Sequence, residues 1–136
     1  MNLCVAYFSR TGNTKRLAQA IADTVKAPIF DLTSTPPSAI SNFDLLILGS
    51  PVEGSSPAKE TATYIDSIQK AEGKKAILFC TYRIFGNERT MKAMEKKLET
   101  KGYTTILKVS KKGMKPDNAA DFSKVLNEIE KAIAKS

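Results

Sequence analysis

The sequence predicts an α/β fold, a doubly wound open sheet of five parallel strands with helices on both faces. Apolar segments of strand length alternate with segments whose apolar residues recur at helical spacing. None of the apolar segments is long enough to span a membrane. With 136 residues, no repeat and no low-complexity tract, the chain is expected to form a single domain, residues 1–136.

The N-terminal part is expected to supply two strands and one helix. Residues 3–8 form an apolar strand, and the helix after it ends near Lys26. The core face of this helix would be Leu17, Ala18, Ile21, Ala22 and Val25. A short second strand is expected at 28–32. Residues 33–42 contain two adjacent prolines, which make this segment a loop that cannot easily be helical.

The middle of the chain is expected to contain two strands with a helix between them. Residues 43–49 are apolar enough for a strand that is buried on both faces. Ser56 would cap the next helix, and Pro57 would occupy its first position. The core face of this helix would be Thr61, Tyr64, Ile65 and Ile68. The fourth strand is expected at 76–81.

The C-terminal part is expected to supply the fifth strand and two further helices. One helix, 87–101, would end at Gly102 and turn Met91, Met94 and Leu98 inward. The fifth strand would be 103–109. Asp117 would cap the last helix. Its buried face would be Phe122, Val125, Leu126, Ile129 and Ile133.

Three loops of unusual composition, 9–14, 50–56 and 82–87, follow strands of the predicted sheet. In open parallel sheets ligands bind beyond the carboxyl ends of the strands, near the point where the strand order reverses. We therefore expect the three loops to meet around one ligand. The first loop lies between a strand and a helix, where backbone N–H groups and the helix dipole favour an anion. The sequence thus predicts a phosphate site there.

Four known kinds of phosphate chemistry fit the first loop poorly. The Walker A and dinucleotide patterns need two or three glycines, and Gly12 is the one glycine here. Cys4 and Arg10 have the spacing of tyrosine-phosphatase loops, but Cys4 lies near the start of a strand, away from the loop. A phospho-receiver domain needs an aspartate after the third strand, where the chain reads Gly49-Ser50-Pro51.

The first loop resembles the phosphate loop of flavodoxins, [ST]-x-T-G-N-T, and the resemblance extends over the whole chain. It implies a short-chain flavodoxin fold with strand order 2-1-3-4-5 and FMN as the cofactor. It also implies that side chains of this loop, together with backbone N–H groups from Arg10 to Lys15, hold the FMN phosphate. The residues concerned are Ser9, Arg10, Thr11, Gly12, Asn13 and Thr14. Two alternatives stay open: the loop only caps the helix, and Arg10 is only a solvated loop residue.

The second loop, 50–56, would lie along the flavin ring. Because residues 50–56 contain no aromatic residue, either Pro51 or Val52 would cover this side of the ring, or this side is left open. In flavodoxins a peptide before a glycine in this loop can flip, so that its carbonyl accepts a hydrogen bond from N5–H of the one-electron-reduced flavin. Glu53-Gly54 looks like that peptide. The alternative is a plain glycine turn.

The third loop would cover the other side of the ring. By resemblance, Tyr82 or Phe85 could stack on the flavin, and backbone N–H groups between Thr81 and Gly86 could face its polar edge. The alternative for Phe85 is a core position under the loop.

Two features depart from the flavodoxin pattern. The chain has no Trp, and residues 50–56 contain no aromatic residue, whereas flavodoxins commonly place two aromatics against the ring. The third loop carries Arg83, and Arg89 follows it, although flavodoxins usually surround the flavin with carboxylates. A guanidinium near the ring would stabilise negative charge on the reduced flavin. We therefore expect a fully reduced flavin that is less reducing than in typical flavodoxins.

Charge is distributed unevenly along the chain. The formal net charge is +7, with 16 of the 21 basic residues after residue 68. This half could dock on an acidic partner or could simply be solvated. Nucleic acid is a weaker candidate, because no aromatic residues accompany the basic run and no nucleic-acid motif is present. There is no signal-peptide pattern, and Cys4 and Cys80 lie in apolar strands, which favours a cytoplasmic protein with reduced thiols.

Two functions are compatible with these features. The first is an electron carrier, not an enzyme, that shuttles low-potential electrons between redox partner proteins. The small size of the chain favours this function, and a monomer is expected. The second is an FMN-dependent oxidoreductase of the NAD(P)H or quinone reductase type on the same fold. Neither function requires a metal, and the sequence contains no histidine.

Overall fold

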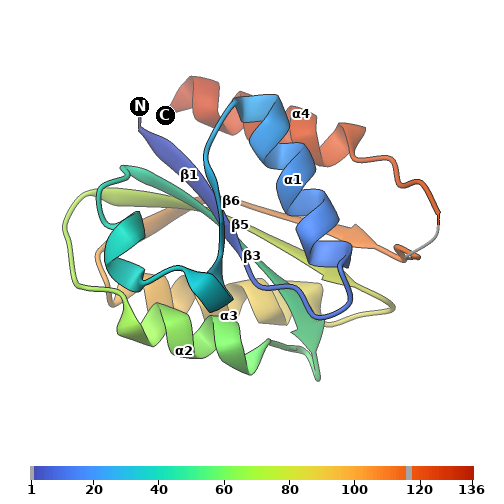
Figure 1. The fold of residues 1–136 in the computed structure, drawn as a ribbon, viewed down its shortest axis with the longest axis horizontal. Coiled ribbons are helices and arrows are strands. Elements are labelled where there is room, and N and C mark those ends of the chain that lie inside the picture. The colour runs from blue at the N-terminus through green and yellow to red at the C-terminus, as the bar shows by residue number, and fades with distance from the viewer. Residues whose placement is uncertain (1, 116–117) are drawn as a thin grey trace.

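A parallel sheet runs through the middle of the molecule in the computed structural model, which describes residues 2–115 and 118–136 (Figure 1). Its strand order is β2-β1-β3-β5-β6. The strands are β1 (Leu3–Tyr7), β2 (Ile29–Asp31), β3 (Leu45–Glu53), β5 (Lys74–Tyr82) and β6 (Tyr103–Lys112). A short strand, β4 (Ser56–Pro57), pairs antiparallel with β3. Apart from β4, the strand order is the predicted one, so the predicted fold class is confirmed.

Two pairs of helices cover the two faces of the sheet (Figure 1). One face carries α1 (Asn13–Val25) and α4 (Ser123–Lys135), and the other carries α2 (Lys59–Ser67) and α3 (Asn87–Glu99). Side chains alternate between the faces along each strand. In β1, for example, Val5 packs under α1 and α4, whereas Ala6 packs toward α2 and α3. None of the helices formed by described residues has the length and apolar character needed to cross a membrane.

The helix faces predicted to be apolar do point into these two clusters. Most of the predicted positions are buried, and the rest are partly buried against the same clusters. The buried ones are Leu17, Ala18, Ile21, Ala22, Thr61, Tyr64, Ile65, Ile68, Met91, Met94, Leu98, Val125 and Ile129. The partly buried ones are Val25, Phe122, Leu126 and Ile133.

The segment 33–42 is less irregular than predicted, because the 3₁₀ helix Leu32–Ser34 extends into it and a second, Pro37–Ile40, lies within it. Asp31 starts the first of them by accepting a hydrogen bond from the backbone N–H of Thr33, at 2.9 Å. Pro37 is the first residue of the second, a position where the missing N–H of proline costs nothing. The prolines therefore excluded an α-helix but permitted a single tight turn.

The predicted start of α2 is wrong. Ser56 and Pro57 belong to β4, where they pair with Glu53 and Val52 of β3. The helix begins at Lys59, and the polar group that serves its N-terminus comes from Ser50. The buried Ser50 Oγ accepts hydrogen bonds from the backbone N–H of Ala58 at 3.0 Å and from Thr61 Oγ1 at 3.1 Å.

Three strands extend further than predicted at their carboxyl ends. β3 continues to Glu53 and reverses at Gly54 and Ser55, whose φ values of 60° and 59° match the type I′ turns of tight hairpins. β5 and β6 also continue, to Tyr82 and Lys112. Asp117, the predicted cap of the last helix, lies outside the described residues. Helix α4 begins at Ser123, whose backbone N–H donates to Asp121 at 2.9 Å.

Candidate functional site

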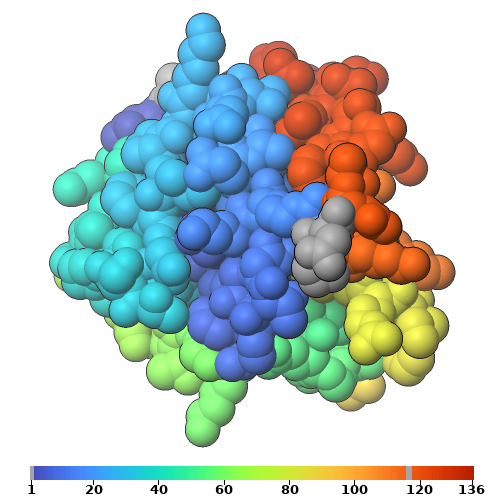
Figure 2. Space-filling view, turned by 45° about the vertical axis from the view of Figure 1, so that its right-hand side comes forward, coloured from blue at the N-terminus to red at the C-terminus, as the bar shows by residue number. Residues whose placement is uncertain are grey.

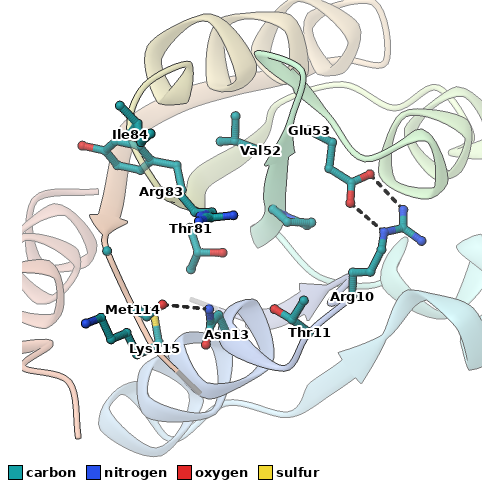
Figure 3. A pocket seen from close by; sticks show the side chains of 13 residues that line it. Arg10, Thr11, Asn13, Val52, Glu53, Thr81, Arg83, Ile84, Met114 and Lys115 are labelled. Carbon is teal, nitrogen blue, oxygen red and sulfur yellow. Dashed lines mark hydrogen bonds and ion pairs between the residues drawn. The ribbon is translucent and has the colours of Figure 1, made fainter. Parts of the chain in front are cut away.

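A cavity of about 580 Å³ opens at the carboxyl ends of β1, β3, β5 and β6 (Figure 3). Its volume lies in the range of small-molecule sites. The lining residues are Arg10, Thr11, Asn13, Pro51, Val52, Glu53, Thr81, Tyr82, Arg83, Ile84, Gly113, Met114 and Lys115. In the space-filling view of Figure 2, blue, green, yellow and orange segments from these four parts of the chain meet on one face. The three predicted loops therefore do come together.

The loop at 9–14 forms the floor of the cavity and leads directly into α1. Gly12 precedes the helix with φ of 99°, a left-handed conformation that suits glycine. Ser9 shapes the loop from inside, because its Oγ accepts hydrogen bonds from the backbone N–H of Gly12 at 3.1 Å and of Lys15 at 3.2 Å. Within the described chain, the backbone N–H groups of residues 10, 11, 13 and 14 have no acceptor. They remain available at a helix N-terminus.

Asn13 carries an unpaired buried atom beside this loop. Its Nδ2 donates to the carbonyl of Met114 at 3.2 Å, as Figure 3 shows. Its Oδ1 is buried and finds no hydrogen-bond donor among the described residues. Buried polar atoms are rarely left unpaired, so this oxygen is suited to a donor from a bound molecule.

The hydroxyl of Thr14 faces the sheet. Its Oγ1 lies 2.8 Å from Oγ1 of Thr81, and both residues are buried. This hydrogen bond joins the first turn of α1 to the end of β5. Thr14 and Thr81 therefore hold two sides of the site together, and Thr14 itself does not line the cavity.

Arg10 is an exposed loop residue, as the alternative of a solvated residue expected, but its side chain also forms ion pairs. Its guanidinium bonds the carboxylates of Glu53 at 2.6 Å and Glu60 at 2.9 Å. It also lies over the ring of Phe8, 4.9 Å from the ring centroid. These hydrogen bonds lower the pKa of Glu60.

The walls of the cavity are mostly apolar. Pro51 and Val52 form one wall, and Tyr82 and Ile84 belong to the other. Arg83 joins the second wall, across the cavity from Asn13 and Thr11 (Figure 3). No aromatic side chain comes from β3, as the sequence indicated.

Several predicted site residues lie near the cavity without lining it: Ser9, Gly12, Thr14, Gly54, Phe85 and Gly86. Phe85 is 72% exposed, so the alternative of a core position is wrong. Gly86 starts α3 with φ of 99°, and a Cβ there would lie 2.9 Å from Cα of Ser55. The third loop and the β3–β4 turn therefore pack closely at this glycine.

The loop after β6 also contributes to the site, which was not predicted. Gly113, Met114 and Lys115 form part of the lining, as does Ile84. Arg16 holds this loop against α1 by donating to the carbonyls of Lys115 at 3.0 Å and Asn118 at 2.6 Å. The signal was present, because a fourth strand ends at the same edge of the sheet and its loop must lie there too.

The two cysteines do not line the cavity. Cys4 and Cys80 are fully buried, and burial raises the pKa of each thiol to about 12. Both therefore stay protonated and act as small apolar core residues.

Known proteins with similar sequences and folds include flavodoxins. The sequence model of a family described as a flavodoxin domain matches residues 4–135. A flavodoxin from Megasphaera elsdenii is 32% identical over 125 residues, 86% of this chain and 90% of that protein. An uncharacterised protein from Methanocaldococcus jannaschii is 32% identical over 95 residues, 69% of this chain and 63% of that protein. Oxidised flavodoxin 1 from Bacillus cereus has the same fold, with a TM-score of 0.80 at 21% identity and 98% of each chain covered. The chain therefore belongs to the flavodoxin family.

Proposed function

We propose that the protein binds FMN in this cavity and carries electrons between redox partner proteins. Bound FMN would supply one- and two-electron chemistry, and the chain would hold it and control its surroundings. The observation that carries the proposal is the N-terminus of α1, whose unpaired N–H groups open into a cavity with apolar walls. Membership of the flavodoxin family supports it.

The phosphate of FMN would lie against the loop at 9–14. Its roughly two negative charges suit the helix N-terminus and the unpaired N–H groups of residues 10, 11, 13 and 14. The hydroxyl of Thr11, which lines the cavity, would add a further donor. Ser9 would act indirectly, because its Oγ already shapes the loop. The buried Oδ1 of Asn13 is an acceptor, so it suits a ribityl hydroxyl better than a phosphate oxygen.

The isoalloxazine ring would lie between the two apolar walls. Pro51 and Val52 would contact one face, and Tyr82 would supply the aromatic contact on the other. Glu53-Gly54 and backbone groups from Thr81 to Gly86 would then border the polar edge of the ring. Arg83 would bring a positive charge to that side.

Titration of the ligand-free protein with FMN, riboflavin and FAD tests this proposal. We expect one FMN per chain, quenched flavin fluorescence, and binding at least about tenfold tighter for FMN than for riboflavin, because riboflavin lacks the phosphate. Equal affinity for FMN and riboflavin would contradict the phosphate site. Absence of flavin binding would contradict the proposal as a whole.

A reductase is the second candidate, favoured by the wall of β3, where an aliphatic pair replaces an aromatic residue and leaves room beside the ring. Anaerobic photoreduction of the FMN-loaded protein separates the two functions. A long-lived one-electron-reduced form supports the carrier. Direct two-electron bleaching with rapid NAD(P)H or quinone turnover supports the reductase.

The partner of the carrier would be acidic. Ile84 and Phe85 project from the third loop with 70% and 72% of their surface exposed, beside the cavity. Exposed basic residues accompany this tip: Arg83, Arg89, Lys112 and Lys115. An apolar contact inside a positively charged border suits a protein surface with carboxylates around a hydrophobic hollow.

A further inference from the structure

We infer that Arg10 is a positioning residue that holds the β3–β4 turn beside the phosphate loop, and is not itself a phosphate ligand. The consequence for flavin binding rests on the proposed function. The contact itself does not, because it lies entirely within the chain. Three elements meet at this guanidinium: the loop after β1, the end of β3 at Glu53, and the first turn of α2 at Glu60.

The hydrogen bonds of Arg10 form two forks. Nε and Nη2 donate to Glu53 at 2.6 and 2.9 Å, and Nη2 and Nη1 donate to Glu60 at 2.9 and 3.1 Å. A guanidinium has five N–H groups, so these bonds use four of them. Its flat face lies over the Phe8 ring, which limits rotation out of this position. Little donor capacity is left for a phosphate.

The position of Glu53 explains how the hydrogen bonds of Arg10 would hold the β3–β4 turn. Glu53 is the last residue of β3 and pairs with Ser56 across the two-residue turn. The tip of the turn at Gly54 is exposed, whereas Ser55 packs against Gly86 of the third loop. The bidentate bond from Arg10 therefore ties the base of the turn to the loop at the N-terminus of α1. Glu60 ties the same guanidinium to α2, so all three elements keep one arrangement.

Neutralising Glu53 or Glu60 should change FMN affinity in opposite directions, depending on whether Arg10 binds the phosphate or positions the turn. Glu53 and Glu60 bring two negative charges close to the phosphate site. If charge alone mattered, neutralising either one would free Arg10 and strengthen FMN binding. If position matters, the same change loosens the turn and weakens FMN binding.

Four single variants test the inference: R10Q, R10K, E53Q and the control K15Q. Lys15 is an exposed cation in the same segment, and its side chain has no partner within the described residues, so K15Q removes charge without removing a contact. Dissociation constants for FMN and for riboflavin are measured for each. We expect R10Q and E53Q to weaken both flavins by a similar factor, about tenfold, since the turn would contact the ring that both ligands share. R10K should resemble R10Q, because lysine keeps the charge but lacks the fork.

The result that overturns the inference is equally specific. If R10Q weakens FMN but leaves riboflavin unchanged, as K15Q is expected to do, Arg10 acts on the phosphate. Tighter FMN binding in E53Q would lead to the same conclusion.

A second measurement does not depend on flavin. Amide hydrogen exchange of the ligand-free protein should be at least threefold faster at Glu53 and Ser56 in R10Q than in the wild type, and unchanged in K15Q. If exchange at Glu53 and Ser56 is unchanged in R10Q, Arg10 does not hold the turn and the inference is overturned. If the wild type binds no flavin, the proposed function fails, and this exchange experiment alone decides the role of Arg10.

Discussion

The hydroxyls of the two buried residues Thr14 and Thr81 lie 2.8 Å apart and form one hydrogen bond with each other. Replacing Thr14 by valine keeps the shape but leaves the Thr81 hydroxyl buried without its partner. We expect T14V to lower the free energy of unfolding by about 1–3 kcal/mol, the usual cost of an unsatisfied buried polar group. Urea unfolding of the ligand-free protein measures this.

The double variant T14V/T81V provides the control. Removing both hydroxyls leaves no buried hydroxyl without a partner, so the stability of the double variant should return toward that of the wild type. Additive losses in the double variant would show that the two hydroxyls do not act as a pair.

Arg83 should influence the redox potential of bound FMN. Its guanidinium lines the cavity, and a positive charge there favours the reduced, anionic flavin. We expect the final reduction step to be less negative than in acidic flavodoxins, and R83Q to make it more negative by tens of millivolts, where ~59 mV is a tenfold change for one electron. Potentiometric titration measures both, with R89Q as the control outside the lining. If R83Q leaves the potential of the final reduction step unchanged, the charge of Arg83 does not act on the flavin ring.

Between elements, Gly86 lies close against the β3–β4 turn. A Cβ at Gly86 would lie 2.8 Å from Ser55 Oγ and 3.1 Å from Val52 Cγ1, and φ is 99°. Gly12 has the same φ, but nothing lies within 4 Å of its Cβ position. G12A therefore isolates the backbone strain, and G86A adds the clash.

We expect G12A to cost about 1 kcal/mol and G86A at least about twice as much, both measured on ligand-free protein. G86A should also displace the turn, visible as chemical-shift changes at Ser55 and Glu53 that G12A does not produce. Equal costs for the two variants would mean that the turn moves aside freely.

The strands and helices were predictable because their signals are repeated along the chain. In α1, several apolar positions point to one face, so a single misjudged residue does not alter the prediction. The start of α2 depended on two residues, Ser56 and Pro57, whose local preference for a helix start was outweighed by pairing with β3. The hydrogen bonds of Ser50 to Ala58 and Thr61 could not be predicted, because they join residues eight and eleven positions apart.

The candidate site was predictable where the sequence carries a motif, and was not predictable where it depends on contacts between distant residues. Its floor carries a motif, so residues 9–14 could be located before the structure was known. The ion pairs of Arg10 join residues 43 and 50 positions apart, and no periodicity reports such contacts. The loop at 113–115 has no motif either, and its place in the lining follows only from the topology of the sheet.

At the scale of the whole molecule, the positive charge should act on anything that approaches the cavity. The formal net charge of +7 attracts anions from all directions, and Lys112 and Lys115 add a local field beside the site. Oxidation of the reduced, FMN-loaded protein by hexacyanoferrate(III) should therefore slow as salt is added. Oxidation by hexaammineruthenium(III) should accelerate, since screening removes a repulsion.

Two double variants separate the local field from the net charge. K112Q/K115Q and K131Q/K135Q remove the same charge, but the second pair lies in the C-terminal half of α4, which Figure 1 shows at the opposite end of the sheet from the strand tips. At 0.1 M salt the Debye length is ~10 Å, so distant charges are screened while charges beside the cavity are not. We expect K112Q/K115Q to reduce the salt dependence clearly and K131Q/K135Q to leave it nearly unchanged. Equal effects would mean that approaching molecules respond to the overall charge, and the basic border of the cavity would then have no role in selecting an acidic partner.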